Sequence, residues 1–314
     1  MSDRVAVVGG GTIGVAWALV FARAGLAVAV HDTEPARLRA VPGELQRRLE
    51  DLAAARLLDE PVDVVLARVR PEAVIDAAVR DAVHVQECVS EDLALKRELF
   101  GTLDRHAPAG ATLASSSSAL TASAIAGHLD GRARCLVAHP ANPPHLLPLV
   151  ELVPAPFTDS ATVERCAALF AAAGLAVVRV RREIEGFIFN RLQGAVLREA
   201  YCLVRDGVAS VEDVDRVVRL GLGRRWAVIG PFETADLNTR GGIAAHAELL
   251  GGAYSRMGAD RGQDDPWTPD LVAQVTGERR ALLPLERWDE RVAWRDRALI
   301  AAERGRREHG PAWR

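Results

Sequence analysis

A glycine-rich turn near the N-terminus constrains the fold more than any other feature of this sequence. Residues 4–8 (RVAVV) form a short, β-branched apolar run, and GGGTIG follows at residues 9–14. Apolar residues at helical spacing then continue as far as Gly25. A strand, a turn of the form GxGxxG and a helix in this order are typical of the first unit of a dinucleotide-binding fold.

Each glycine of this turn has its own expected role. Gly9 permits a tight turn, Gly11 lets the backbone approach a pyrophosphate, and Gly14 lets the helix pack closely on the strand. The next apolar run, residues 27–30, is followed by Asp32, which lies 18 residues beyond Gly14. Such folds carry at this place the acid that binds the adenosine ribose, and a carboxylate there repels a 2′-phosphate. The sequence therefore predicts NAD rather than NADP as the cofactor.

A second candidate site lies at residues 135–154, CLVAHPANPPHLLPLVELVP. One apolar run ends in His139, a proline-rich segment follows, and a second apolar run carries Glu151. Prolines restrict φ and remove backbone donors, so we expect a rigid loop between two strands that returns Glu151 to His139. A carboxylate on one imidazole nitrogen leaves the other nitrogen free as a base. A buried pair with a purely structural role fits the same residues, and both interpretations stay open here.

Polar side chains follow two further strand-like runs. Glu91 and Lys96 come after the run at residues 82–86, beside the predicted cofactor crevice. An exposed ion pair at a helix start and a contact with the cofactor are equally compatible with their spacing. Four serines, residues 115–118, follow the run at residues 111–114, and they offer either a helix cap or a hydroxyl for a substrate.

The pattern of the chain changes at Gly186. Before it, strand-like runs alternate with helical segments as far as residues 176–180; after it, helical periodicity continues to about residue 308. We therefore predict an α/β, Rossmann-like domain at residues 1–185 and an all-α domain at residues 186–314. Asn190 lies early in the first helix of the second domain among apolar neighbours, which predicts that it faces either solvent or a polar site.

Composition narrows the functional class. The 314 residues, 49% of them hydrophobic, can bury a large core, and a formal net charge of −3 gives no electrostatic basis for binding nucleic acid or an anionic membrane. The four cysteines are isolated, which is typical of a reducing compartment and argues against a structural zinc. The sequence shows no signal-peptide pattern and no apolar run of membrane-spanning length. We expect a cytoplasmic protein that needs no metal.

These residues together make the chain resemble the 3-hydroxyacyl-CoA dehydrogenase superfamily, and within it the branch of the L-gulonate 3-dehydrogenases and lambda-crystallin. The likeness spans nearly the whole chain and is carried by residues 85–100 (VQECVSEDLALKRELF), 139–154 (HPANPPHLLPLVELVP), 186–201 (GFIFNRLQGAVLREAY) and 221–238 (GLGRRWAVIGPFETADLN). The last two segments are the specific ones, because the acyl-CoA enzymes have a shorter loop without an equivalent of Arg225 and Trp226. One departure is Ser117, where the family usually has a threonine.

The resemblance implies a role for each candidate residue. It implies that His139 is the catalytic base with Glu151 as its partner, and that the helical domains pair to form a homodimer. It places Ser118, Asn142 and Asn190 around the substrate hydroxyl or carbonyl. It also places NAD contacts at Thr12, Ile13, Asp32, Glu91 and Lys96.

Two substrate classes remain open at this point. The expected activity is NAD-dependent oxidation of the 3-hydroxyl of a small hydroxy acid such as L-gulonate; the alternative substrate is an L-3-hydroxyacyl-CoA such as 3-hydroxybutyryl-CoA. By the resemblance, Arg224 and Arg225 lie in a loop over the substrate pocket. They favour the hydroxy acid because a guanidinium binds a carboxylate bidentately, and we expect Arg225 to face the pocket.

An interpretation from another class is a crystallin-like structural protein or an NAD-sensing pseudoenzyme. Neither role would require His139, Glu151 and Asn190, and all three residues are present. The sequence therefore favours an enzyme.

Overall fold

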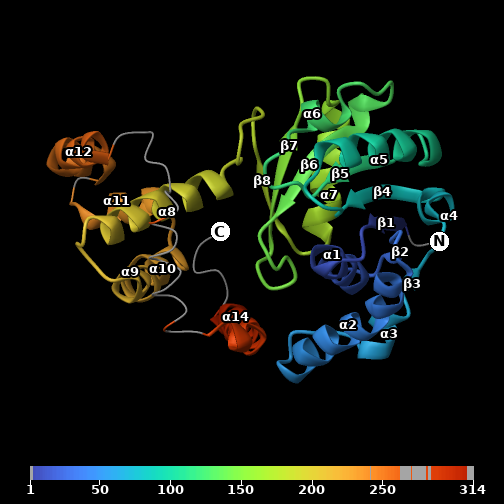
Figure 1. The fold of residues 1–314 in the computed structure, drawn as a ribbon, viewed down its shortest axis with the longest axis horizontal. Coiled ribbons are helices and arrows are strands. Elements are labelled where there is room, and N and C mark those ends of the chain that lie inside the picture. Colours follow the sequence, from blue (N-terminus) through green and yellow to red (C-terminus); the bar gives the residue numbers. More distant parts are fainter. Residues whose placement is uncertain (1–2, 241, 262–269, 271–280, 282–283, 310–314) are drawn as a thin grey trace. The chain divides into compact units, whose positions relative to one another are not determined.

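The computed structural model describes residues 3–240, 242–261, 270, 281 and 284–309 (Figure 1). Its contacts divide the chain into two compact units, Met1–Arg191 with Val292–Arg314 and Leu192–Arg291. Residues from Val292 onwards thus group with the N-terminal unit rather than with the helical segment before them. The domain boundary expected after residue 185 stays a prediction.

The first unit contains an eight-stranded sheet with the strand order β3-β2-β1-β4-β5-β6-β7-β8 (Figure 1). Neighbouring strands from β3 to β6 are parallel, β7 runs antiparallel to β6, and β8 is parallel to β7. This order of the first six strands is that of a dinucleotide-binding fold, whose ligand crevice lies where the order reverses, between β1 and β4. The predicted fold class is confirmed. The strands span Arg4–Val8 (β1), Ala27–His31 (β2), Val69–Pro71 (β3), Ala82–Glu87 (β4), Thr112–Ser115 (β5), Cys135–Pro140 (β6), Leu149–Pro154 (β7) and Ala176–Arg179 (β8).

The edge strand β3 was not among the elements predicted from the sequence. Its residues Val69–Pro71 pair with β2. Three residues are too few to show an alternating pattern, and Pro71 is tolerated because β3 lies at the sheet edge.

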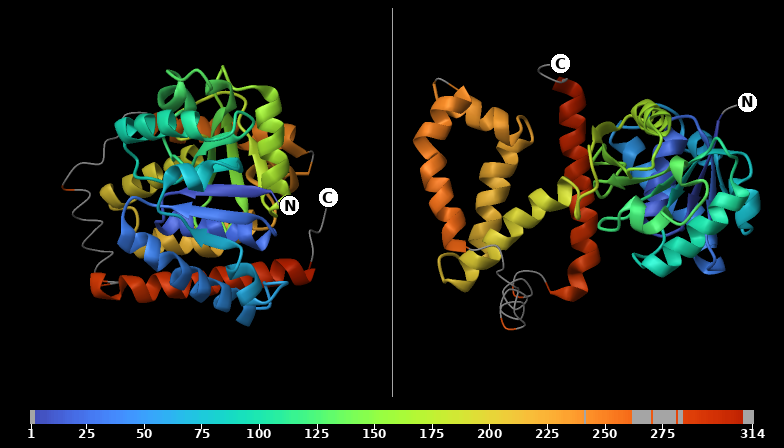
Figure 2. Two further views of the ribbon diagram at one scale, coloured as in Figure 1. Left: turned by 90° about the vertical axis from the view of Figure 1, so that its right-hand side faces the viewer. Right: turned by 90° about the horizontal axis from the view of Figure 1, so that it is seen from above.

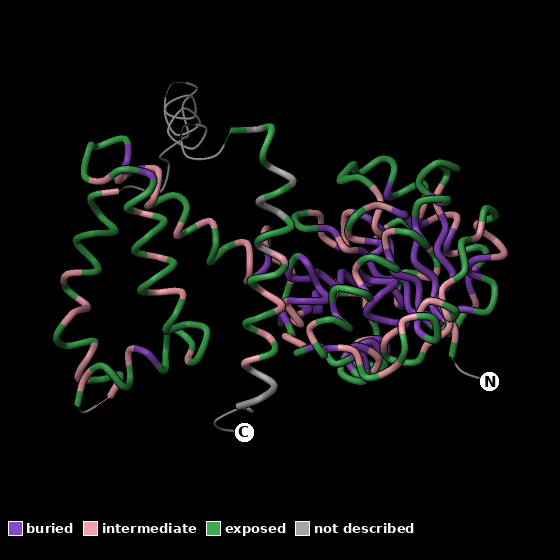
Figure 3. The backbone as a smooth tube through the Cα atoms, turned by 90° about the horizontal axis from the view of Figure 1, so that it is seen from below, coloured by how far each residue is buried: buried purple, intermediate pink, exposed green. Residues whose placement is uncertain are grey.

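Helices cover both faces of the sheet, so most of its strands are apolar on both sides. On one face, the core is built with α1 (Thr12–Arg23), α2 (Pro35–Ala54), α3 (Val62–Leu66) and α7 (Ser160–Ala172). On the other face lie α4 (Ile75–Val79), α5 (Leu93–His106) and α6 (Ala122–Ala126). Buried residues concentrate in this layered unit (Figure 3).

The strands β6 and β7 form a hairpin across the proline-rich segment. Their register places His139 directly opposite Glu151. The loop between them carries a cis peptide bond at Asn142–Pro143. The expected loop between two strands that returns Glu151 to His139 is therefore present.

The chain becomes helical after β8, and none of the described residues that follow forms a strand. Ser210 caps α9 by accepting a hydrogen bond from the Asp213 amide, and Pro231 starts α11. Residues 221–226, predicted as a loop, are instead helical, because glycines lower helix propensity without preventing a helix. The helices are α8 (Phe189–Arg205), α9 (Val211–Val217), a π turn (Val218–Leu222), α10 (Gly223–Trp226), α11 (Pro231–Asn238) and α12 (Gly242–Arg261).

The last described helix, α14 (Trp288–His309), follows a short 3-10 turn at Leu285–Arg287 (Figure 2). Its residues Leu299 and Ile300 pack against the core of the first unit. Among the described helices, none is both long and apolar enough to cross a membrane.

His84 is a buried histidine in β4 whose ring contacts two aromatic side chains. Its ring centroid is 5.7 Å from that of Phe21 and 5.4 Å from that of Phe170, and Nε2 lies 3.1 Å from Gln86 Oε1. Burial lowers the pKa of His84 from 6.5 to about 4, against the opposing effect of the hydrogen bond to Gln86. The folded chain therefore keeps this imidazole neutral at a pH where the unfolded chain binds a proton.

His84 should make the stability of the first unit depend on pH. Because its pKa is lower in the folded than in the unfolded chain, its contribution is complete above pH 6.5 and is lost as the pH falls to about 4. A shift of this size corresponds to about 3 kcal/mol. His84→Gln should therefore flatten the fall in unfolding free energy over this range, measured by urea titration at each pH. His128→Gln, at an exposed histidine, should leave the fall unchanged, and equal slopes in the two variants would contradict the assignment.

Candidate active site

The β6–β7 hairpin brings His139 and Glu151 together as a buried pair. His139 Nδ1 lies 2.8 Å from Glu151 Oε2, and the two side chains are 6% and 2% exposed. Because the carboxylate accepts at Nδ1, the neutral imidazole carries its proton there and Nε2 keeps a free lone pair. The rings of Phe187 and Phe189 lie 5.4 and 6.3 Å from the imidazole. This geometry suits a general base oriented by a carboxylate.

The second oxygen of Glu151 binds the backbone at the start of α8. Glu151 Oε1 accepts hydrogen bonds from the amides of Ile188 at 2.8 Å and Phe189 at 3.0 Å. Amides at a helix N-terminus have no partner within the helix, and a carboxylate satisfies them. This contact was not predicted from the sequence; Gly186, just before the helical run, is the signal that a sharp turn precedes α8.

Asn190 connects the start of α8 to the serine turn after β5. Its Nδ2 donates a hydrogen bond to the backbone carbonyl of Ser118 at 2.9 Å. A continuous set of contacts therefore joins four of the predicted site residues. It runs from His139 to Glu151, along the backbone to Asn190, and on to Ser118.

Two predicted substrate residues stand apart from this set of contacts. Asn142 is an exposed residue of the β6–β7 loop. Arg225 is exposed in α10 and belongs to the second unit. Their roles at the substrate stay predictions.

Glu91 fixes the conformation of the serine turn. Its Oε1 accepts hydrogen bonds from the Ser117 hydroxyl and from the amides of Ser118 and Ala119. Desolvation acts against the charged form, but these donors together with Lys96 hold the pKa of Glu91 below its ordinary value. The Ser117 hydroxyl is thus engaged inside the turn, whereas Ser118 is exposed.

Lys96 is buried rather than part of an exposed ion pair. With 1% of its side chain exposed, its ammonium lies 2.7 Å from Glu87 Oε1 and 3.4 Å from Glu91 Oε2. Burial raises the pKa of Glu87, while Lys96, the Ser115 hydroxyl and the Val89 amide act in the opposite direction. Glu87 is a candidate site residue that was not predicted from the sequence, although its place at the end of a strand beside the crevice marks it. A direct contact between Lys96 and NAD stays a prediction.

A cavity of about 380 Å³ opens beside the glycine turn. A Cβ at Gly9, where φ is 110°, would lie 2.6 Å from the Cys88 carbonyl oxygen, and one at Gly14 would lie 1.8 Å from the Gly9 carbonyl oxygen. Gly11 instead faces open space, with no atom within 4 Å of the place of a Cβ. Gly9 and Gly14 allow close packing, and Gly11 leaves room at the helix N-terminus for a phosphate. The predicted cofactor residues that line the cavity are Gly9, Gly11, Thr12, Ile13 and Asp32.

Asp32 is held at the edge of this cavity by backbone amides. Its Oδ2 accepts a hydrogen bond from Gly10 at 2.7 Å and its Oδ1 one from Glu34 at 2.8 Å. Arg37 also lines the cavity, and its guanidinium lies 2.7 Å from the Glu34 carboxylate. The charge of Arg37 is balanced by Glu34. That the glycine turn binds the phosphates and Asp32 the ribose hydroxyls of the dinucleotide stays a prediction, which this lining suits.

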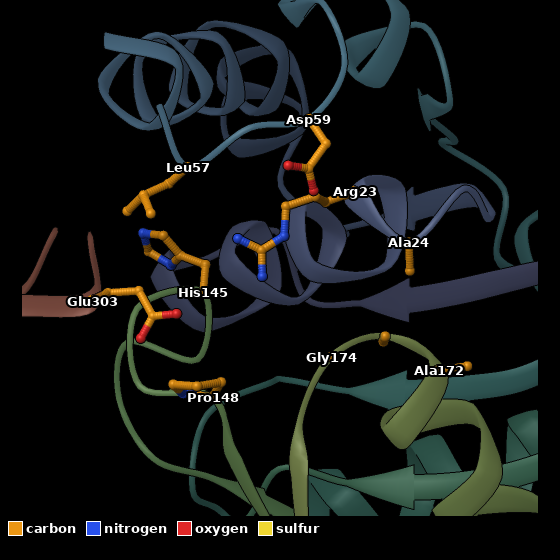
Figure 4. Close-up of a pocket in the computed structure, with 10 residues that line it drawn as sticks. Arg23, Ala24, Leu57, Asp59, His145, Pro148, Ala172, Gly174 and Glu303 are labelled. Atoms are coloured by element: carbon orange, nitrogen blue, oxygen red, sulfur yellow. The ribbon is translucent and has the colours of Figure 1, made fainter. Parts of the chain in front are cut away.

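Another cavity, of about 200 Å³, contains none of the predicted site residues (Figure 4). Arg23 at the end of α1, Asp59, His145 of the β6–β7 loop and Glu303 of α14 line it. Charges of both signs share this small space. The cavity lies where the β6–β7 loop and α14 pack against the rest of the first unit.

Comparison with known proteins identifies the family. The description "3-hydroxyacyl-CoA dehydrogenase, NAD binding domain" matches residues 4–184, and "3-hydroxyacyl-CoA dehydrogenase, C-terminal domain" matches residues 186–280. The chain belongs to the 3-hydroxyacyl-CoA dehydrogenase family. It is therefore an NAD-dependent dehydrogenase, and the predicted family, enzyme class and cofactor are confirmed.

Relatives within the 3-hydroxyacyl-CoA dehydrogenase family carry different names. The chain is 41% identical over 300 residues to the lambda-crystallin homolog of Bos taurus, covering 94% of this chain and 93% of the relative. It is 39% identical over 269 residues to L-carnitine dehydrogenase of Streptomyces griseus, covering 84% and 76%. A solved structure of an NAD-dependent 5-formyl-3-hydroxy-2-methylpyridine 4-carboxylic acid 5-dehydrogenase superposes with a TM-score of 0.84 at 28% identity, covering 97% and 98%.

Proposed function

We propose that this dehydrogenase oxidises the 3-hydroxyl of a small hydroxy acid resembling L-gulonate, with His139 as the general base. The observation that carries the proposal is the buried pair of His139 Nδ1 and Glu151 Oε2 at 2.8 Å. This pair leaves Nε2 as the proton acceptor in a protein whose family and cofactor are established.

The reaction divides among the chain's own residues as follows. His139 takes the hydroxyl proton at Nε2, and Glu151 stabilises the imidazolium through Nδ1–H. Asn190, whose second amide hydrogen is not needed for Ser118, donates to the substrate oxygen as it becomes a carbonyl, together with the Ser118 hydroxyl. NAD, when bound, supplies the acceptor for the hydride that leaves the same carbon. Because His139 must be neutral to act, oxidation should lose activity at low pH.

The choice of a hydroxy acid over an acyl-CoA rests on charge. Arg224 and Arg225 are adjacent and exposed in α10, and a guanidinium binds a carboxylate bidentately. Relatives that are 39% and 34% identical are L-carnitine dehydrogenases, and carnitine is a hydroxy acid with a free carboxylate. A relative that is 35% identical is named 3-hydroxyacyl-CoA dehydrogenase, so an L-3-hydroxyacyl-CoA is the alternative substrate.

We also propose that the active form is a homodimer built through the helical unit. Phe232 in α11 is 83% exposed, and large apolar side chains are also exposed at Val228, Leu237 and Leu249. Exposed apolar surface of this kind marks an interaction site, and a second copy of the chain offers a matching apolar surface.

The base assignment is tested by His139→Gln, which removes the titrating group while keeping a polar side chain. The expected loss in kcat is ~10²–10⁴-fold. Glu151→Gln should also lower kcat, because it removes the charge that stabilises the imidazolium. NADH formation by the purified variants measures both, with His128→Gln as the control at an exposed histidine. Near-wild-type turnover in His139→Gln would reject the assignment.

The substrate class is tested by Arg225→Met, with Arg224→Met as the matched control. If Arg225 binds the substrate carboxylate, kcat/KM for a hydroxy acid should fall roughly tenfold to a hundredfold, as for the loss of a charge-assisted hydrogen bond. NADH affinity, from fluorescence titration, should not change. An equal loss of NADH affinity would contradict the role of Arg225. A wild type that oxidises 3-hydroxybutyryl-CoA but no free hydroxy acid would favour the alternative substrate class.

The dimer is tested by Phe232→Glu, which places a charge on the exposed apolar surface. Sedimentation velocity should show a dimer for the wild type and a smaller species for the variant, because burying an unpaired carboxylate is unfavourable. Val83→Glu offers a control at an exposed apolar residue of the first unit. A monomeric wild type would contradict the proposal.

A further inference from the structure

The connection between β8 and α8 has an unusual backbone conformation. Gly186 and the next residue, Phe187, have φ values of 74° and 51°. Glycine adopts this left-handed region without steric cost, whereas a residue with a bulky side chain does so only when its surroundings hold it there. Such outliers cluster at functional sites.

Burial of the phenyl ring explains how Phe187 is held. The side chain is 0% exposed and belongs to a small apolar cluster with Val137 of β6 and Val153 of β7. Its ring centroid lies 5.4 Å from that of His139, at an interplanar angle of 55°. The favourable burial of this large ring therefore offsets the unfavourable backbone conformation.

The left-handed turn determines where the next two amides point. Directly after it, the amides of Ile188 and Phe189 donate to Glu151 Oε1 at 2.8 and 3.0 Å. A right-handed conformation at Phe187 would turn the following peptide groups away from this oxygen. The turn also sets the start of α8 and therefore the place of Asn190.

We propose that Phe187 is a positioning residue for the oxidation, acting through the His139–Glu151 pair. Its backbone conformation delivers two amide donors to Glu151, and its ring packs on the imidazole that Glu151 orients. This proposal rests on the proposed role of His139 as the base.

The two amides and the imidazole donate hydrogen bonds to the same carboxylate, so together they stabilise the negative charge of Glu151. Without them, the carboxylate would attract the positively charged imidazolium more strongly, so a smaller fraction of His139 would be the neutral base at low pH. Among the described residues, Glu151 of β7 is the titratable group in contact with the imidazole, and Phe187 and Phe189 pack against its ring. Misplacing the amides should therefore move the low-pH limb of kcat/KM to higher pH.

The test compares Phe187→Leu with Phe187→Ile. Both side chains are apolar isomers that lack the ring, but the β-branch of isoleucine disfavours positive φ more strongly. We expect kcat of the isoleucine variant to be on the order of tenfold below that of the leucine variant, as for one lost charge-assisted hydrogen bond. Its low-pH limb should lie at higher pH, and NADH affinity should be the same in both. The same pair at Phe100, a buried phenylalanine of α5 outside the site, is the control and should differ little.

A second pair keeps the test decisive if Phe187→Ile does not fold. Phe187→Gly accepts a positive φ freely, whereas Phe187→Ala resists it, and both leave nearly the same space. We expect the glycine variant to be the more active of the two, with the low-pH limb nearer to that of the wild type.

The outcomes separate this inference from the proposed function. Equal kcat and equal low-pH limbs within both pairs, in an enzyme that His139→Gln inactivates, would overturn the role of Phe187 and leave the base in place. Near-wild-type activity of His139→Gln would overturn the base assignment itself. A loss in proportion to unfolded protein, with an unchanged pH profile, would mean that Phe187 is a packing residue only.

Discussion

The buried carboxylate of Glu151 is the group on which the rest of the site depends. A charged group that leaves water must be hydrogen-bonded, and Glu151 meets this requirement with the His139 ring and the amides of Ile188 and Phe189. One side chain therefore joins the β6–β7 hairpin to the first helix after the sheet. Removing it would free the imidazole and the helix start together, so its catalytic and structural effects are inseparable in a single variant. Changes at Phe187 alter the same contacts while leaving the carboxylate in place.

A second set of buried charges organises the end of β4. Lys96 neutralises Glu87 and reaches Glu91, and Glu91 in turn holds the backbone of the serine turn. Because Asn190 binds the carbonyl of Ser118 in that turn, the proposed oxygen-binding residues and the proposed base are both anchored by carboxylates that accept backbone amides. The residues proposed for the chemistry thus belong to the first unit.

Features that depend on local pattern were predictable. The strand, glycine turn and helix at the N-terminus follow from periodicity over about twenty residues, and the hairpin follows from two apolar runs around a proline-rich segment. Features that are short or poorly patterned were not predictable. The edge strand β3 has three residues, and residues 221–226 look like a loop because they contain two glycines, yet they are helical. In both cases the contacts of the folded chain decide the conformation.

The dinucleotide-binding fold class and the return of Glu151 towards His139 were evident from the sequence, because the glycine turn and the two apolar runs around a proline-rich segment are local patterns. The contacts between residues that are distant in the chain emerged only in the folded structure. In the folded chain, Lys96 is buried against Glu87 rather than exposed, and the Ser117 hydroxyl donates a hydrogen bond to Glu91. Glu151 accepts hydrogen bonds from amides that lie 37 and 38 residues away in the sequence. No periodicity encodes such contacts. They exist because buried charges and amides must find partners wherever packing brings them together.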